Sequence, residues 1–293
     1  HGSRRNKEVR YGFDVVFKES ASQKDVFTGT ASPLIPLVLD GFNATVFAYG
    51  ATGCGKTHTI TGTPSDPGII FLTMRELFAQ IEARSAHHVI ESSVSYLEVY
   101  NETIRDLLSP SPSISAPLDL REDETHVVVA GLSEHRPRSV EDIMDMLIRG
   151  NENRTRAPTE ANAVSSRSHA VLQIHIKSRE RVQGIRAVFR TAVLSIIDLA
   201  GSERASATKN KGERLLEGAN INRSLLALGN CINALCSDKP NHIPYRDSKL
   251  TRLLKYSLGG NCKVVMIANI SPSPIHYDET HNTLKYANRA KNI

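Results

Sequence analysis

A run of eight residues near the start of the chain has the composition of a phosphate-binding loop. Residues 50–57, with the sequence G-A-T-G-C-G-K-T, fit the pattern G-x-x-x-x-G-K-[ST]. Glycines let the backbone N–H groups of such a loop point inward around phosphate oxygens, and the helix that follows adds the positive end of its dipole. Lys56 would reach the β- and γ-phosphates, and the Thr57 hydroxyl would ligate Mg²⁺. The pattern therefore predicts a nucleotide site formed by Gly50, Ala51, Thr52, Gly53, Cys54, Gly55, Lys56 and Thr57.

A carboxylate stands where such a site needs one. Residues 193–197, V-L-S-I-I, are typical of a buried strand, and Asp198 follows them directly. Ligands bind at the carboxyl ends of parallel strands in α/β sheets. Alone, Asp198 would more often be a strand-end turn residue. Beside a phosphate-binding loop, we expect Asp198 to hold Mg²⁺ through water.

The elements that would position these residues alternate along the chain. Strand-type apolar runs lie at 44–49, 94–99, 127–129, 170–176, 193–197 and 264–270, and helical patterns lie at 23–39, 71–83, 140–149, 213–235, 248–256 and 278–290. Runs that are apolar throughout suit strands covered on both faces. The alternation predicts an α/β fold with a central, mainly parallel β-sheet and helices on both faces, and the phosphate-binding motif makes it a fold of the P-loop NTPase type. The loop at 50–57 lies between a strand and a helix-compatible stretch, as its motif requires.

Composition narrows the class of protein. The chain has 293 residues, 40% of them hydrophobic, which is enough for one large domain spanning 1–293. It has no apolar stretch of membrane-spanning length, no signal-peptide pattern and only four cysteines, so we expect a cytosolic or nuclear protein without a membrane partner. The net charge of +5 favours an acidic partner. The lack of Trp argues against a nucleic-acid surface built on base stacking.

Four motifs, in order along the chain, resemble those of kinesin motor domains. Residues 162–169, N-A-V-S-S-R-S-H, resemble the kinesin switch I motif, and residues 198–203, D-L-A-G-S-E, resemble switch II. Residues 220–225, N-I-N-R-S-L, resemble the start of the relay helix, and residues 245–254, Y-R-D-S-K-L-T-R-L-L, resemble the microtubule-facing loop and helix. The likeness extends from about Tyr11 to Ile293. It implies the kinesin motor fold, with ATP and Mg²⁺ as cofactors.

The resemblance also implies roles for the switch I residues. Ser166 would approach Mg²⁺ and the γ-phosphate, so that Thr57, Ser166 and Asp198 form the metal site. Ser165 and Asn162 would help to place the loop and the attacking water. A polar loop without a catalytic role is the alternative for this run, since Ser favours loops in any case.

Switch II and its neighbours receive roles in the same way. Gly201 would offer its backbone N–H to the γ-phosphate, a close approach that the lack of a Cβ permits. Arg167 and Glu203 would form a salt bridge that closes the switches around ATP. His58 would stack on adenine, although an ordinary surface position suits it equally, and Asn222 would link the site to the relay helix. The catalytic set is then Lys56, Asn162, Ser165, Ser166, Arg167, Gly201 and Glu203.

The resemblance places the microtubule-binding surface on residues 205–214, the relay helix and residues 239–252. Its expected contact residues are Lys209, Lys211, Arg214, Lys239, Tyr245, Arg246, Lys249 and Arg252. Tubulin is acidic, so a basic surface would steer the encounter with microtubules. An ordinary solvated basic face is the alternative interpretation.

Within the kinesins, the chain is most similar to the kinesin-8 class, which implies plus-end-directed movement combined with destabilisation of microtubule ends in the mitotic spindle. Kinesins open with a core strand and an R-x-R-P segment, which nothing before Tyr11 matches. The neck linker and dimerising coiled coil would follow Ile293. We therefore expect a monomeric fragment of a homodimeric protein of the cytoplasm and cytoskeleton.

Rival functions remain open at this point. The chain could be a kinesin-like module that binds nucleotide and microtubules without productive cycling, but the residues needed for hydrolysis argue against it. A GTPase switch is disfavoured because the sequence has no N-K-x-D base-recognition motif. A P-loop enzyme that acts on nucleic acid rests on the basic charge alone.

Overall fold

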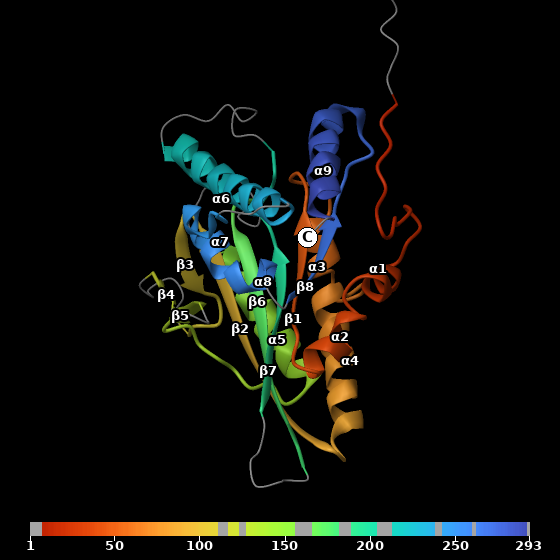
Figure 1. The fold of residues 1–293 in the computed structure, drawn as a ribbon, viewed down its shortest axis with the longest axis vertical. Coiled ribbons are helices and arrows are strands. Elements are labelled where there is room, and N and C mark those ends of the chain that lie inside the picture. Colours follow the sequence, from red (N-terminus) through yellow and green to blue (C-terminus); the bar gives the residue numbers. More distant parts are fainter. Residues whose placement is uncertain are drawn as a thin grey trace, which may run out of the picture.

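The computed structural model describes residues 8–110, 117–122, 127–155, 166–181, 189–203, 213–237, 242–259 and 262–291. Its centre is a six-stranded sheet with the order β3-β2-β6-β7-β1-β8, flanked by helices (Figure 1). These strands are β1 (Asn43–Tyr49), β2 (His88–Tyr100), β3 (Thr103–Asp106), β6 (His169–Glu180), β7 (Arg190–Asp198) and β8 (Cys262–Ala268). A small antiparallel sheet pairs β4 (Asp119–Glu122) with β5 (Val127–Ala130).

The sheet is mixed. Strand β1 runs parallel to both of its neighbours, β7 and β8. In contrast, β6 pairs antiparallel with β7 and with β2, and β2 pairs antiparallel with β3. The expectation of a mainly parallel sheet thus holds around the phosphate-binding loop and not in the other half. Connection length explains the β2–β3 pair, because the two-residue connection Asn101–Glu102 can only join antiparallel strands.

The turn between β2 and β3 has an uncommon backbone. Asn101 and Glu102 both have positive φ angles, of 50° and 57°. Two successive left-handed residues are what a type I′ hairpin turn requires, because that turn matches the twist of the strands. Asn tolerates this conformation, whereas Glu seldom adopts it.

The helices follow the sequence pattern with two breaks. They are α1 (Gln23–Gly29), α2 (Leu34–Leu39), α3 (Lys56–Ile60), α4 (Ile69–Arg84), α5 (Val140–Thr155), α6 (Glu213–Leu235), α7 (Lys249–Leu253), α8 (Lys255–Leu258) and α9 (Tyr277–Ala290). The single helix predicted over 23–39 is wrong. Pro33 precedes Leu34 at the start of α2, and proline can neither donate a backbone hydrogen bond nor continue a preceding helix. The helix predicted over 248–256 is also divided, at Leu254.

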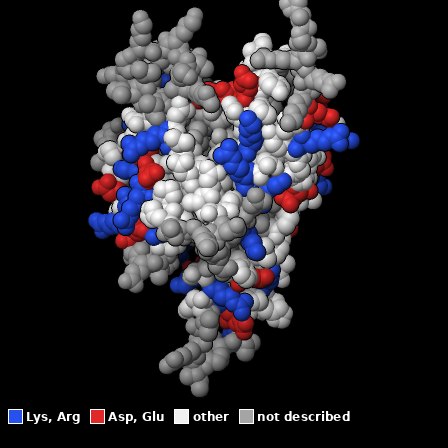
Figure 2. Space-filling view, turned by 45° about the horizontal axis from the view of Figure 1, so that its top comes forward, with Lys and Arg blue, Asp and Glu red and all other residues white. Residues whose placement is uncertain are grey.

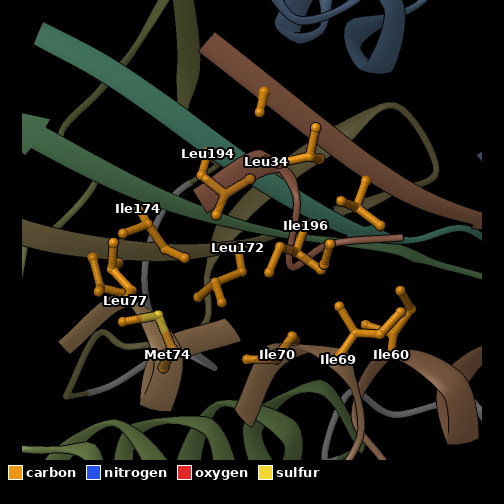
Figure 3. Packing of buried hydrophobic residues seen from close by; sticks show 14 of the residues in the cluster. Leu34, Ile60, Ile69, Ile70, Met74, Leu77, Leu172, Ile174, Leu194 and Ile196 are labelled. Carbon is orange, nitrogen blue, oxygen red and sulfur yellow. The ribbon is translucent and has the colours of Figure 1, made fainter. Parts of the chain in front are cut away.

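Hydrophobic packing forms a core on each face of the sheet. One core joins the sheet to α2, α3 and α4, and includes Leu172 and Ile196 (Figure 3). The other joins it to α6, α7 and α8, and includes Val171 and Ile197. Adjacent residues of one strand belong to opposite cores, as the period of a strand requires. This arrangement confirms the prediction of strands covered on both faces.

No helix in the described part of the chain has the length and apolarity that a membrane crossing requires.

Candidate nucleotide site

The phosphate-binding loop connects β1 to α3 as the sequence predicts. Strand β1 ends at Tyr49, and α3 begins at Lys56 after Gly55, whose φ of 89° is left-handed. A Cβ at Gly50 would collide with the backbone oxygen of Asn269, the residue directly after β8. Asn269 also donates its backbone N–H to Tyr49 O, at 2.8 Å. The residue that follows β8 therefore packs against the start of the loop, and the motif alone does not predict this contact.

Lys56 is buried within this loop. It is 6% exposed, and its Nζ donates to the carbonyl oxygen of Ala51 at 3.0 Å. Burial lowers the pKa of Lys56, while the nearby carboxylates of Asp198 and Glu203 oppose that shift. A desolvated ammonium flanked by loop N–H groups is suited to the charge of a polyphosphate.

Thr57 and Asp198 meet where the sequence places the metal. Thr57 Oγ1 donates to Asp198 Oδ2 at 2.8 Å. Asp198 Oδ1 is buried and has no hydrogen-bond partner among the described residues. A buried carboxylate oxygen is costly unless something binds it. Because Mg²⁺ keeps several waters and needs only one or two protein oxygens, these residues fit a hydrated Mg²⁺ beside a nucleotide.

The charge of Asp198 is balanced by Arg154, a residue that sequence reasoning missed. Arg154 lies near the end of α5 and is 2% exposed. Its guanidinium donates to Asp198 Oδ2 at 2.8 Å, to Ser168 O at 2.8 Å and to Ser168 Oγ at 3.1 Å. The side chain therefore fixes Asp198 relative to the start of β6. Arg154 stands in a run of charged and polar residues, so nothing local marks it as buried.

Residues 198–203 touch both neighbouring parts of the site. Glu203 accepts hydrogen bonds from Thr52 N at 2.8 Å and from Thr52 Oγ1 at 2.5 Å. Ser202 N donates to Gly50 O at 3.1 Å. Gly201 N donates to Ser166 O at 2.8 Å, and a Cβ at Gly201 would collide with Thr52 and Glu203. The loop thus lies against both the phosphate-binding loop and Ser166 of switch I.

Several predicted roles of these residues stay predictions. The N–H of Gly201, which we expected to face the γ-phosphate, donates here to Ser166. Arg167 and Glu203 each have interactions in the structure, and their salt bridge remains an expectation. Ser166 and Asn222 likewise have partners of their own.

His58 lies at the outer side of α3. Its ring Nδ1 is 3.1 Å from Gln23 Nε2, which also donates to the backbone oxygen of His58 at 2.7 Å. The side chain is 57% exposed, and its Nε2 is 3.9 Å from Asp66. Gln23 therefore orients the ring, and the exposed ring leaves room for the predicted stacking on adenine.

Some predicted site residues fall outside the described part of the chain. These are Asn162 and Ser165 in switch I, and Lys209, Lys211 and Lys239 on the predicted microtubule surface. Arg214 lies in α6, but its side chain is not described. Their roles stay predictions.

The described residues of the predicted microtubule surface lie on and before α7. Tyr245 and Arg246 form a 3₁₀ turn that leads into α7, which carries Lys249 and Arg252. Lys249 N donates to Glu102 Oε2 at 2.8 Å, and Lys249 Nζ is 4.0 Å from Asp119 Oδ1 of β4. The face drawn in Figure 2 shows Lys and Arg in separate groups, with acidic side chains among them. The contact between Lys249 and Asp119 places this segment beside the small β4–β5 sheet.

Comparisons with known proteins agree with this geometry. The model of the kinesin motor domain matches residues 1–293. Kinesin-like protein 5 of Schizosaccharomyces pombe is 62% identical over 290 residues, which are 98% of this chain and 33% of that protein. KIP3 of Saccharomyces cerevisiae is 63% identical over 294 residues, 99% of this chain and 36% of that protein. Human KIF18B is 57% identical over 293 residues, 99% of this chain and 34% of that protein.

A solved structure matches across nearly the whole chain. It is described as a KIF14 dimer in a two-heads-bound state, with AMP-PNP, in complex with a microtubule. Its TM-score is 0.88 at 40% identity, over 97% of this chain and 82% of that one. The chain spans about a third of the length of the curated relatives named above, which are kinesin-8 proteins. Matched from end to end by the family model and at more than half identity by these relatives, the chain belongs to the kinesin motor domain family.

Proposed function

We propose that this chain is the motor core of a microtubule-stimulated ATPase that couples ATP hydrolysis to movement on microtubules. The observation that carries the proposal is the position of residues 198–203. Glu203 bonds to Thr52 of the phosphate-binding loop, while Gly201 bonds to Ser166 of switch I. One short loop therefore contacts both walls of the phosphate site. A ligand that moves either wall moves this loop.

The chemistry asked of these residues is positioning and charge stabilisation. Phosphoryl transfer needs little covalent help from the protein. Lys56 and the loop amides would bind the phosphates, with water as the nucleophile. Thr57, Asp198 and Ser166 would hold Mg²⁺, which when bound neutralises charge on the β- and γ-phosphates. Arg154 would hold Asp198 in position, because removing either partner of a buried ion pair is costly.

Movement requires the track to bind the nucleotide states of the motor with different free energies. Helix α6 follows the 198–203 loop along the chain and packs against α7 and α9. A displacement of the loop would therefore reach the side of the molecule that carries Lys249 and Arg252. The related KIF14 structure, which holds AMP-PNP on a microtubule, supports a track-bound nucleotide state for this fold.

The kinesin-8 relatives support a finer proposal. We propose that residues 1–293 form one motor domain of a plus-end-directed homodimer, which also destabilises microtubule ends. Its place would be the cytoplasmic microtubule cytoskeleton, including the mitotic spindle, with a nuclear location also open. Neither nucleic acid nor membrane is a proposed partner.

The test combines ATPase assays with cosedimentation. Microtubule affinity is measured without nucleotide, with ADP and with AMP-PNP, and hydrolysis is measured with and without microtubules. We expect affinities that differ by about 10-fold between nucleotide states, within the usual range of coupling between two sites. Equal affinity in all states would overturn the motor proposal. Stimulation by free tubulin dimers, compared with lattice, tests the kinesin-8 part separately.

A further inference from the structure

His169 lies at the junction of three parts of the molecule. It is the last residue of the switch I motif and the first residue of β6, and it is 2% exposed. Ala200 N, in the loop after β7, is 3.1 Å from His169 Nδ1. Ser224 Oγ, on α6, is 2.8 Å from His169 Nε2. Figure 1 shows α6 at the end of the sheet where β6 begins and β7 ends. One buried ring thus joins a phosphate-facing loop to α6.

The direction of each hydrogen bond follows from the chemistry of the partners. A backbone N–H can only donate, so His169 Nδ1 accepts from Ala200. Burial, together with the positive charges of Arg154 and Lys56, lowers the pKa of His169 to about 3, so the ring is neutral. A neutral imidazole that accepts at Nδ1 carries its proton at Nε2 and donates it to Ser224 Oγ. The Ser224 hydroxyl then donates to Ile221 O at 2.7 Å.

The three hydrogen bonds therefore point the same way, from loop to ring to hydroxyl to helix. At one end, Ala200 precedes Gly201, whose N–H holds Ser166. At the other end, Ile221 belongs to the core between α6 and the sheet. Every member is buried, so breaking a link leaves a polar group without a partner, which costs about 1–3 kcal/mol. Movement of the 198–203 loop without α6 would break a link and incur that cost.

We infer that His169 is a positioning residue that couples the 198–203 loop to α6 through the hydrogen-bond chain Ala200–His169–Ser224–Ile221. The inference deepens the proposed function and rests on it, since it says which contacts transmit the state of the phosphate site to the track side. His169 touches neither phosphate nor track in this role. It acts by making the loop and the helix move as one body.

Two variants each remove the hydrogen bond between His169 and Ser224, one by changing the serine and the other by changing the histidine. Ser224→Ala removes the hydroxyl that His169 contacts, while His169→Asn keeps an acceptor near the Nδ1 position and is too short to reach Ser224. Ser195→Ala is the matched control for the first, because Ser195 is buried on β7 and its hydroxyl has no partner among the described residues. His175→Asn, on the same strand as His169, is the control for the second.

The readout is the ratio of microtubule affinities with AMP-PNP and with ADP. We expect both cutting variants to reduce this ratio at least 5-fold, while Ser224→Ala keeps basal ATP turnover. The double variant should be no worse than the singles, since both remove one link. The control variants should keep the wild-type ratio. A wild-type ratio in Ser224→Ala and His169→Asn would overturn the inference, as a purely structural role lowers stability without changing this ratio.

A second measurement separates this inference from the motor proposal. Amide hydrogen exchange over residues 220–235 of α6 is compared between ADP and AMP-PNP without any track. We expect a nucleotide-dependent difference in the wild type and its loss in Ser224→Ala, a variant that deletes a single hydroxyl. If the wild type lacks nucleotide-dependent track affinity but shows this exchange difference, the motor proposal fails and the coupling stands. If the difference persists in Ser224→Ala, the coupling fails.

Discussion

The nucleotide site and the α7 surface use charge in opposite ways. At the nucleotide site, Arg154 and Asp198 are each 3% exposed in their side chains and lie 2.8 Å apart. On the α7 surface, Lys249 and Asp119 are 28% and 88% exposed and lie 4.0 Å apart. A buried pair is held rigidly because separation leaves an uncompensated charge, whereas an exposed pair contributes little to stability. Exposed charge is instead available to a partner.

The sharpest way to break this comparison is to remove Arg154. In Arg154→Met, Asp198 would remain buried without its guanidinium, and we expect the free energy of unfolding to fall by about 3–5 kcal/mol. Urea denaturation monitored by circular dichroism measures this. The control is Arg84→Met, which removes a half-exposed partner of Asp40 at the same 2.8 Å distance and should cost less than about 1 kcal/mol. Equal losses would show that burial does not distinguish the two pairs.

Glu203 tests whether charge at the nucleotide site serves turnover rather than binding. Its carboxylate holds the backbone and hydroxyl of Thr52. In Glu203→Ala we expect ATP still to bind, while turnover with microtubules falls by about 10²-fold, the scale for losing one preorganised electrostatic contact. Nucleotide titration and steady-state hydrolysis measure the two effects. Glu82→Ala, an exposed position on α4, serves as control. Unchanged microtubule-stimulated hydrolysis would contradict this role.

The smallest expected effect concerns the α7 surface. Lys249→Glu with Arg252→Glu should weaken microtubule affinity by about 10-fold at low salt, because steering by charge near the surface depends on ionic strength. Basal ATP turnover should not change. The pair Lys24→Glu and Arg75→Glu, on α1 and α4, makes the same change in net charge elsewhere. Cosedimentation across a salt series compares them, and equal affinities of the two double variants would remove α7 from the track surface.

The sequence could predict the features that contiguous residues determine, but not those that depend on residues far apart in the chain. The phosphate-binding loop is contiguous, so eight residues specify its geometry and its flanking strand and helix. Switch residues followed from resemblance, again through local motifs. Arg154, His169 and Ser224 acquire their roles only through partners far away in the chain, and no local pattern indicates burial of an arginine or the partner of a histidine.

The errors in the fold have a similar origin. Alternating apolar runs show which segments are buried strands, but not which strands become neighbours. The pattern therefore could not predict the antiparallel pairing of β6 with β2 and β7. The break before Pro33 was visible in principle, because proline at that position cannot continue a helix.

The left-handed turn at Asn101 and Glu102 has a consequence for how the two track-side helices relate. Asn101 Oδ1 accepts from Asn220 of α6 at 2.6 Å, and Glu102 Oε2 accepts from the first backbone N–H of α7. The turn of the β2–β3 hairpin thus contacts both helices. A glutamate held in this backbone conformation stores strain of about 1–3 kcal/mol, which the surrounding contacts must offset. A tilt of α6 that displaces Asn101 would also displace the adjacent Glu102, which binds the first turn of α7. The hairpin turn would therefore transmit movement of one helix to the other.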